Sequence, residues 1–245
     1  MSRSSVKSSP APATRKRIAV APRAVAADAV PVARTRGRPR QFDQEVLLDA
    51  AIPIFWRHGY EGTSIADLTV AMGVTPPTLY AAFGSKEELY RQVLARYTRS
   101  GTGQARAAAF IANPSAYQAI AIYLRDTAMD FASPKHPAGC LVSTATVHCA
   151  VESKPAAEAT AACRAQAIAL FEQKFAAAKK SRELPMSADP GALARFYGAV
   201  IQGMSVQACD GADAKMLSAL VDTALAAWPG KTVAKITGKT GRKAP

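Results

Sequence analysis

The chain has 245 residues, of which 49% are hydrophobic and 7% aromatic, and its formal net charge is +13. This length admits one large domain or two small ones, and the apolar content is enough for a substantial core. No apolar run reaches membrane-spanning length, and the N-terminus lacks the apolar region of a secretory signal. The four cysteines form no C-x-x-C pair, which is typical of a reducing compartment. We therefore expect a cytoplasmic protein without a membrane partner.

The positive charge is concentrated at the two ends of the chain. Residues 1–40 hold ten Lys or Arg and one acid, and residues 229–245 hold five Lys or Arg and no acid. The middle, 41–228, is nearly balanced, with 16 basic and 17 acidic residues. Both ends lack hydrophobic periodicity, so we expect disordered basic tails that meet a polyanion. For 1–40 an organelle transit peptide stays open as an alternative, since the segment is rich in Ser, Ala and Arg.

The segment between the tails is predicted to be entirely helical, because it shows 3.6-residue periodicity and no alternating strand pattern. Pro53 is expected to bend the first helix. Ser115, Asp189 and Asp213 are candidate N-caps. Helices are expected from Asp43 to Arg57, after Thr63–Ser64, at 75–83, from Ser85 past Tyr97, and at 115–132, 138–152, 155–182, 189–208 and 213–228.

The stretch GVTPPTLYAAFG, residues 73–84, places two prolines in a predicted helix. Proline is tolerated in the first helical turn, whose N–H groups have no partner within the helix. With Thr75 as N-cap, Pro76 and Pro77 occupy that turn, so they start the helix. A helix, a glycine turn and a short helix together predict a helix-turn-helix. Such an opening also occurs in helices that do not bind DNA, and this alternative stays open.

One face of the predicted helix is small and nearly uncharged, which suits insertion into a major groove. Tyr80 can offer its hydroxyl to a phosphate, and helix N-termini near Thr63, Ser64 and Ser85, with Lys86, present donors to phosphates. The residues expected to face the bases are Thr75, Pro76, Pro77, Thr78 and Ala82.

The span from Gly37 to Tyr97 resembles the DNA-binding domain of the tetracycline-repressor (TetR/AcrR) family. The matching residues are GRPRQFD, AAIPIFWRHGYEGTSIADLTVAMGV and TPPTLYAAFGSKEELYRQVLARY. The resemblance implies an all-α homodimer, with a three-helix DNA-binding domain at 41–97 and an effector-binding and dimerisation domain at 98–228. Most members of the family are repressors that a small molecule releases from a palindromic operator, without a cofactor. The family's base-reading positions fall on Thr75, Pro76, Pro77 and Thr78, and its phosphate positions on Thr63, Ser64, Tyr80 and Lys86.

The basic run just before the first helix, Arg36-Gly37-Arg38-Pro39-Arg40, resembles the core of an AT-hook. We expect Arg38 or Arg40 to contact a minor groove. The alternative is an unspecific polycation that raises DNA affinity only at low salt.

The C-terminal half is expected to hold the effector, and each candidate could equally be a plain core residue. Cys140 follows a proline-glycine break and is a candidate thiol sensor, with a buried inert cysteine as the alternative. A metal site built from Cys140, His148 and Cys149 would need ligands from elsewhere, so none is expected. The candidate effector residues are Tyr123, Met129, Phe131, Cys140, His148, Phe171, Phe196 and Gln202.

The last two helices are predicted to form the dimer interface, because each carries an apolar stripe with small residues. These stripes could instead belong to the core of the chain. An enzyme is not expected, since three histidines and no GxSxG, P-loop, GxGxxG or HExxH pattern provide no catalytic constellation. The stripes are Phe196, Val200, Ile201 and Met204, and Met216, Leu217, Leu220, Thr223, Ala224 and Ala227.

Overall fold

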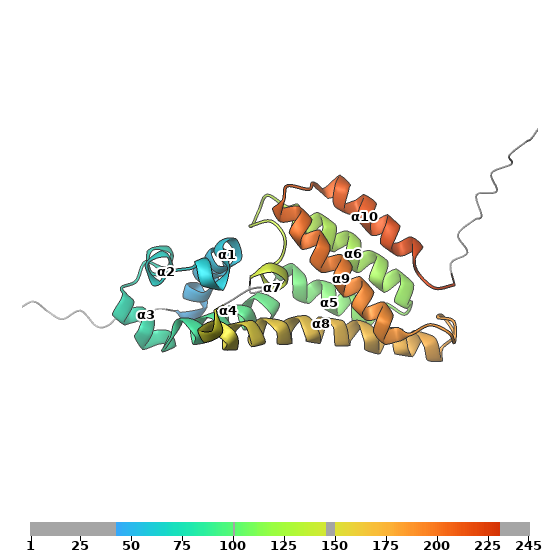
Figure 1. Cartoon of the computed structure of the whole chain (residues 1–245), viewed down its shortest axis with the longest axis horizontal. Helices are drawn as coiled ribbons and strands as arrows, with labels where there is room; N and C mark the ends of the chain where they lie inside the picture. The colour runs from blue at the N-terminus through green and yellow to red at the C-terminus, as the bar shows by residue number, and fades with distance from the viewer. Residues whose placement is uncertain (1–42, 100, 146–149, 231–245) are drawn as a thin grey trace, which may run out of the picture. The chain divides into compact units, whose positions relative to one another are not determined.

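The computed structural model describes residues 43–99, 101–145 and 150–230, and every regular element in these ranges is a helix (Figure 1). No helix within these ranges is both long and apolar enough to span a bilayer. In chain order the helices are α1 (Gln44–Gly62), α2 (Ile65–Met72), α3 (Pro76–Phe83), α4 (Lys86–Arg99), α5 (Gly101–Ala112), α6 (Ala116–Phe131), α7 (Leu141–Thr144), the 3-10 helix η1 (Val151–Ser153), α8 (Lys154–Lys180), α9 (Pro190–Cys209) and α10 (Ala214–Ala226).

Most of the predicted helices are confirmed, together with the caps that begin them. The side chains of Ser115, Asp189 and Asp213 accept hydrogen bonds from the first turns of α6, α9 and α10. Helical dihedral angles continue through Pro53, and the backbone of α1 departs from them at Gly59, where φ is 68°. The expected bend at Pro53 is therefore replaced by a kink at Gly59.

Two predictions about the middle of the chain are wrong. The helix expected at 138–152 is reduced to the four residues of α7 and the three of η1. Its β-branched valines and threonines are weak helix formers, and Gly139 is held in a left-handed conformation (φ 74°) against α9. Conversely, α5 was not predicted, because Gly101 and Gly103 stand at its start. Tertiary packing stabilises it, since Phe110 is buried against the rings of Tyr123 and Phe171.

The first three helices and α4 enclose one hydrophobic core, which lies at one end of Figure 1. Arg96 on α4 makes a bidentate ion pair with Asp49 on α1, with both N–O distances 2.9 Å, and a further ion pair with Glu45. Leu141 on α7 and Ala156 on α8 are buried in the same core. Helices α1 to α4 therefore share their core with α7 and the start of α8.

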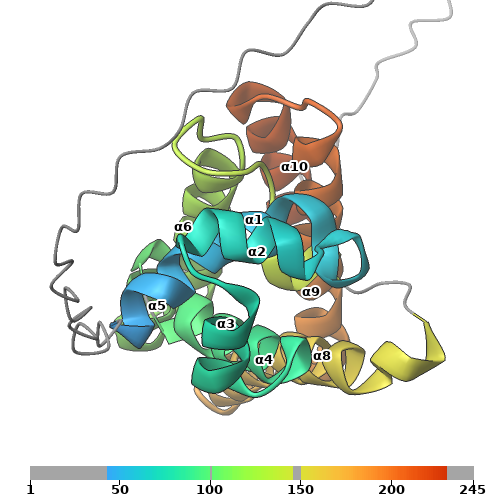
Figure 2. The same cartoon turned by 90° about the vertical axis from the view of Figure 1, so that its left-hand side faces the viewer.

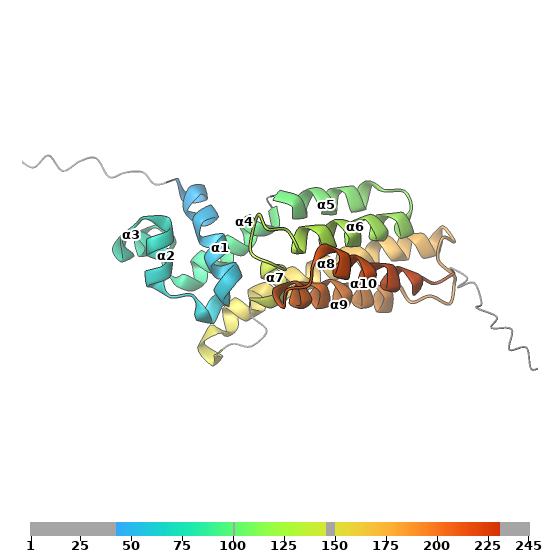
Figure 3. The same ribbon diagram turned by 90° about the horizontal axis from the view of Figure 1, so that it is seen from above.

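The remaining long helices form a bundle in which α8 packs on α9, α10 on α6 and α9, and α5 on α6. Figure 3 shows α5 and α6 side by side, with α8, α9 and α10 beside them. Aromatic rings fill its centre, and Phe175 contacts both Tyr197 and Trp228 at centroid distances of 5.9 and 5.4 Å. This second core is separate from the one around α1 to α4.

Several hydrogen bonds join α1 and α4 to the segments that follow them, and two of these lie at Tyr60 and Tyr90. The Tyr60 amide donates to the carbonyl of Ala145 at 3.2 Å. The Thr160 hydroxyl donates to the Ala156 carbonyl, so it accepts from the Tyr90 hydroxyl, at 3.0 Å in a buried position. These bonds tie α1 to the end of α7, and α4 to α8.

The start of α6 is capped by a carboxylate from a distant part of the chain. Glu183 accepts from the Ser115 hydroxyl at 2.7 Å and from the amides of Ala116 and Tyr117, both at 2.9 Å. Burial opposes the charge, but these hydrogen bonds outweigh it and lower the pKa of Glu183. The carboxylate thus satisfies N–H groups that the helix leaves free.

Replacing Glu183 with Gln should lower the free energy of unfolding by about 1–2 kcal/mol near neutral pH, since the amide offers one acceptor oxygen and no charge. Because the folded-state pKa is lowered, the stabilisation is present above the unfolded pKa of Glu. It is lost as the pH falls through the folded value, so the two proteins should converge in acid. Urea unfolding followed by circular dichroism measures the difference at each pH.

Glu158→Gln is the matched control, because this glutamate is 67% exposed and pairs only across 3.6 Å with Lys154. A surface pair of this kind contributes about 0–1 kcal/mol. Equal unfolding midpoints for Glu183→Gln and the wild-type chain near neutral pH would contradict the assigned cap.

Candidate nucleic-acid interface and effector cavity

Helix α3 begins as its sequence predicts. Thr75 is the N-cap, and Pro76 and Pro77 occupy the first two helical positions. The Thr75 hydroxyl does not cap the helix, because it pairs with the Thr78 hydroxyl at 2.9 Å. Gly73 ends α2 in the left-handed conformation (φ 64°), which turns the chain into α3.

Helix α3 turns one side into the protein and the other to solvent (Figure 2). Leu79 and Phe83 are buried. Thr75, Pro76 and Pro77 are exposed, and Tyr80 is 47% exposed. The helix carries no charged residue. This small, polar and apolar surface can enter a major groove without steric or charge conflict.

The residues predicted to contact phosphates differ in their availability. Thr63 is only 1% exposed, and its hydroxyl donates to the Gly59 carbonyl at 2.6 Å. This side chain is therefore not available to a phosphate, contrary to the prediction. Ser64 is exposed at the start of α2, in a capping box with Asp67. The ammonium of Lys86 lies 4.4 Å from the centre of the Tyr60 ring, at the start of α4. Desolvation lowers the pKa of Lys86, and the Glu61 carboxylate partly opposes this.

Three of the predicted site residues lie outside the described ranges: Arg38, Arg40 and His148. Their proposed roles stay predictions.

A cavity of about 490 Å³ opens beside the bundle, and residues of α1, α4, α5, α6, α7, α8 and α9 and of the segment before α7 border it. Volumes of this order are typical of small-molecule sites. The structure does not bring Met129 and Phe196 to this wall, because their side chains point outward and are 60% and 40% exposed. The predicted effector residues that line it are Tyr123, Phe131, Cys140, Phe171 and Gln202.

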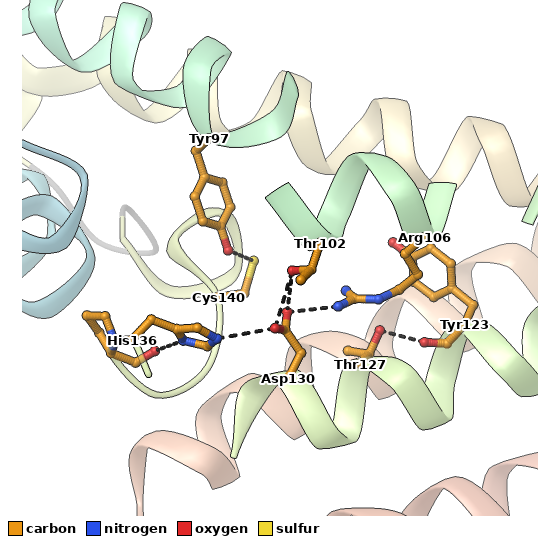
Figure 4. A network of polar contacts seen from close by, with 9 residues as sticks. Tyr97, Thr102, Arg106, Tyr123, Thr127, Asp130, His136 and Cys140 are labelled. Atoms are coloured by element: carbon orange, nitrogen blue, oxygen red, sulfur yellow. Dashed lines mark hydrogen bonds and ion pairs between the residues drawn. The ribbon is translucent and has the colours of Figure 1, made fainter. Parts of the chain in front are cut away.

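A polar network on the half-buried Asp130 forms one side of the cavity (Figure 4). Arg106 on α5 donates to the carboxylate at 2.8 Å, and Thr102 donates at 3.2 Å. His136 places Nε2 3.2 Å from the same carboxylate. Burial disfavours the charge of Asp130, but the hydrogen bond and charge of Arg106, aided by His136, lower its pKa. An ionised carboxylate therefore holds α5 and the His136 segment on α6.

His136 links this network to α1. Its Nδ1 lies 2.9 Å from the Pro137 carbonyl, so both ring nitrogens face oxygen acceptors. Both contacts are hydrogen bonds together only when both nitrogens carry hydrogen. The ring stacks on Trp56 of α1 at 4.8 Å, and Trp56 meets the edge of Tyr97 at 5.1 Å. The cavity therefore touches α1 directly.

Cys140 lies on the cavity wall beside Tyr97. Burial raises the pKa of the Tyr97 hydroxyl well above its ordinary value, and the neighbouring Cys140 adds to this effect. The hydroxyl therefore keeps its proton, which it donates to Sγ of Cys140 at 3.5 Å. The Cys140 amide donates to the Ser205 hydroxyl at 2.8 Å, which fixes the residue on α9. Cys149 lies outside the described residues, and within the described ones no three His, Cys, Asp or Glu side chains come together as a metal site would require.

Sequence reasoning missed the residues that make the polar side of the cavity: Trp56, Thr102, Arg106, Asp130 and His136. The available signal was the HPAGC segment, 136–140, whose proline and glycine exclude a regular helix. Arg106 and Asp130 gave no signal, because single charges on predicted helices are usually solvated.

Comparison with known proteins agrees with this arrangement. The sequence profile described as "Bacterial regulatory proteins, tetR family" matches residues 47–93. The HTH-type transcriptional repressor ComR of Escherichia coli (strain K12) is 37% identical over 198 residues, which cover 81% of this chain and 94% of ComR. The HTH-type transcriptional repressor BdcR of the same organism is 45% identical over 64 residues, 26% of this chain and 32% of BdcR.

Among solved structures, a cysteine-substituted TetR family transcriptional regulator CifR, complexed with 26-bp double-strand operator DNA, superposes with a TM-score of 0.75. It is 42% identical and covers 79% of this chain and 100% of its own. The similarity to ComR and CifR extends through the helix-turn-helix and the bundle alike. The chain belongs to the tetR family of bacterial regulatory proteins.

Proposed function

We propose that the chain is a cytoplasmic, homodimeric transcriptional repressor that a small-molecule effector releases from a palindromic operator. The observation that carries this function is the direct contact between the cavity and α1, through the stack of His136 on Trp56. A molecule bound in the cavity changes the position of that stack, and α1 packs against α2 of the helix-turn-helix. The repressor ComR and the operator complex of CifR support the same function.

Base reading is assigned to the exposed face of α3. Thr75 and Thr78 offer hydroxyls and methyl groups to base edges, while Pro76 and Pro77 offer methylenes that fit a thymine methyl. Tyr80, 47% exposed, offers its hydroxyl to the phosphate backbone. Ser64 and Lys86 flank this face at the starts of α2 and α4, where free helical N–H groups also favour phosphates.

Arg38 and Arg40 are assigned to the adjacent minor groove. They precede α1 by a few residues, and an arginine there can follow the narrow groove of an AT-rich sequence. This contact supplements α3, whose reading face carries few polar groups.

Dimerisation is assigned to the outward faces of α9 and α10. Three residues of the apolar stripes predicted from the sequence cannot lie in this interface, because Met204, Leu217 and Ala224 are buried inside the chain. The residues that recur at helical spacing on the outside are Ala192, Phe196, Ala199, Gly203 and Val206 of α9, and Met216, Ala219, Thr223 and Ala226 of α10. The small residues among them permit close approach of two copies, and Phe196 and Met216 supply apolar surface.

Cys140 supports a second candidate, in which the same repressor responds to electrophiles or oxidants. The observation in its favour is a half-buried free thiol on the cavity wall. Modification of Sγ would fill the cavity that the effector would otherwise occupy.

The proposed function is tested by selecting fragments of the host genome on the purified full-length protein. A palindromic sequence should be enriched, because a two-fold dimer places its two α3 helices about one turn of DNA, or a multiple, apart. Footprinting should then show protection of both half-sites. Recovery of fragments with no shared palindrome would refute operator recognition.

Lys86→Gln should weaken operator binding and flatten its salt dependence. Each lost phosphate contact lowers the slope of log K against log salt by about 0.9, and a dimer loses two such contacts. The slope is measured by fluorescence anisotropy over a salt series. Arg38→Ala with Arg40→Ala, in the same assay, should flatten the slope further.

Lys215→Gln on α10 is the matched control, since it removes one exposed lysine from the bundle. Lys86 also contacts the Tyr60 ring, so thermal unfolding is recorded for both variants. A destabilised Lys86→Gln protein with an unchanged salt slope would assign Lys86 a structural role only.

Phe196→Glu should convert the dimer to a monomer, because a two-fold interface would bury the new charge twice. Light scattering after size exclusion measures the mass, and operator affinity should fall by at least about tenfold when the half-sites are no longer linked. Met186→Glu is the control, because Met186 is 71% exposed between α8 and α9. A dimeric Phe196→Glu protein would move the interface elsewhere.

A further inference from the structure

Two buried nitrogen atoms on the cavity residues have no hydrogen-bond partner. Among the described residues, they are the only buried side-chain nitrogen or oxygen atoms in this condition: Nε1 of Trp56 and Nε of Arg106. Both residues line the cavity. More than about nine in ten buried polar groups in proteins are paired, and an unpaired one costs about 1–3 kcal/mol. Both atoms belong to residues of one cavity, so a ligand bound there with acceptor atoms would give them partners once their side chains turn.

The chemistry of these two atoms defines which groups a ligand must carry to pair with them. An indole N–H and a guanidinium N–H can only donate. The ligand must therefore bring acceptors, such as carbonyl or carboxylate oxygens. An ammonium group, which only donates, would leave both nitrogens unpaired.

The charges on the wall favour an anion. The lining contains two cationic side chains, Arg106 and Arg164, against one carboxylate, Asp130. Asp130 already accepts from Thr102 and Arg106 and is met by His136, so its charge is compensated within the protein. The side chain of Arg106 is only 9% exposed, where a charge interacts strongly.

The beginning of α5 adds to this preference. Gly101, Thr102 and Gly103 form its first turn and line the same cavity. The free N–H groups and the positive end of a helix dipole attract anions. Arg106, with its unpaired Nε, lies one turn further along the same helix.

Much of the remaining wall is apolar, with the rings of Trp56, Phe131 and Phe171 and the side chains of Ile168 and Leu170. This surface matches an aromatic or branched hydrocarbon body of a size that about 490 Å³ can hold. We propose that the effector is a small carboxylic acid, bound as its carboxylate, with such a body. This inference rests on the proposed function, whose effector site it specifies.

Binding of this kind has a mechanical consequence. The two unpaired nitrogens have almost no solvent-accessible surface, so their side chains must turn to meet the ligand. Trp56 lies between the stacked His136 ring and the edge of Tyr97, and it belongs to α1. A carboxylate that accepts from Trp56 therefore displaces the contact between the cavity and the helix-turn-helix.

The test uses two hydrocarbon bodies, naphthalene and cyclohexane, each carrying a carboxylate, a carboxamide or a methylammonium group. Calorimetry on the full-length dimer without DNA measures each affinity. On the body that fits, the carboxylate should bind at least about tenfold more tightly than the carboxamide, and the ammonium compound should not bind. An ammonium compound that binds as tightly as the carboxylate would overturn the proposal.

The two tryptophans of the chain provide a matched pair of variants. Trp56→Phe keeps an aromatic ring but removes the N–H, so carboxylate affinity should fall about 2–10-fold, as expected for one hydrogen bond. Trp228→Phe changes a ring that is 4% exposed in the bundle core, and affinity should be unchanged. It also leaves Trp56 as the sole tryptophan, whose fluorescence should change on binding. Equal affinities for the two variants would overturn the assignment.

Operator selection distinguishes a wrong effector class from a wrong proposed function. If the protein enriches an operator but binds none of the carboxylates, the effector class is wrong and the proposed function stands. If it binds the carboxylates through Trp56 but enriches no palindrome, the site stands and the proposed function is wrong.

Discussion

The Asp130 carboxylate organises the part of the molecule on which the proposed regulation depends. It is ionised in a largely buried position, which is favourable only while donors surround it. Arg106 and Thr102 supply those donors from α5, and His136 supplies another from the segment before α7. The same His136 ring stacks on Trp56 of α1. The cavity beside Asp130 is thus connected to the DNA-binding helices through packed rings.

Two hydrogen bonds in the core around α1 to α4 strengthen the connection. The Tyr60 amide binds the Ala145 carbonyl, and the Tyr90 hydroxyl binds Thr160, so α1 and α4 follow the segments that border the cavity. Packed interiors do not deform continuously but shift between discrete arrangements. A ligand that turns the Trp56 ring would therefore move the helix-turn-helix as a unit, and effector and operator would oppose each other.

The exposed face of α3 offers few hydrogen-bonding groups to the bases of DNA. Proline at both first positions leaves two fewer backbone donors, and the Thr75 and Thr78 hydroxyls bind each other. The helix therefore offers shape and apolar contact more than hydrogen bonds. Phosphate contacts position such a helix without reading sequence, and under the proposed function DNA shape and the arginines before α1 would supply the remaining specificity.

Local chemistry in the sequence determined the fold class, the start of α3 at Thr75, the glycine turn at Gly73 and the caps of α6, α9 and α10. These features depend on proline, glycine and cap side chains that act within a few residues, so the sequence predicts them. Only the tertiary structure decided that α5 forms and that 138–152 does not form one helix. It also decided that Met129 faces solvent, and that Arg106 and His136 meet on Asp130. These outcomes depend on packing between segments far apart in the chain, where a helix may turn either face to its neighbours, and no local pattern specifies which face is buried.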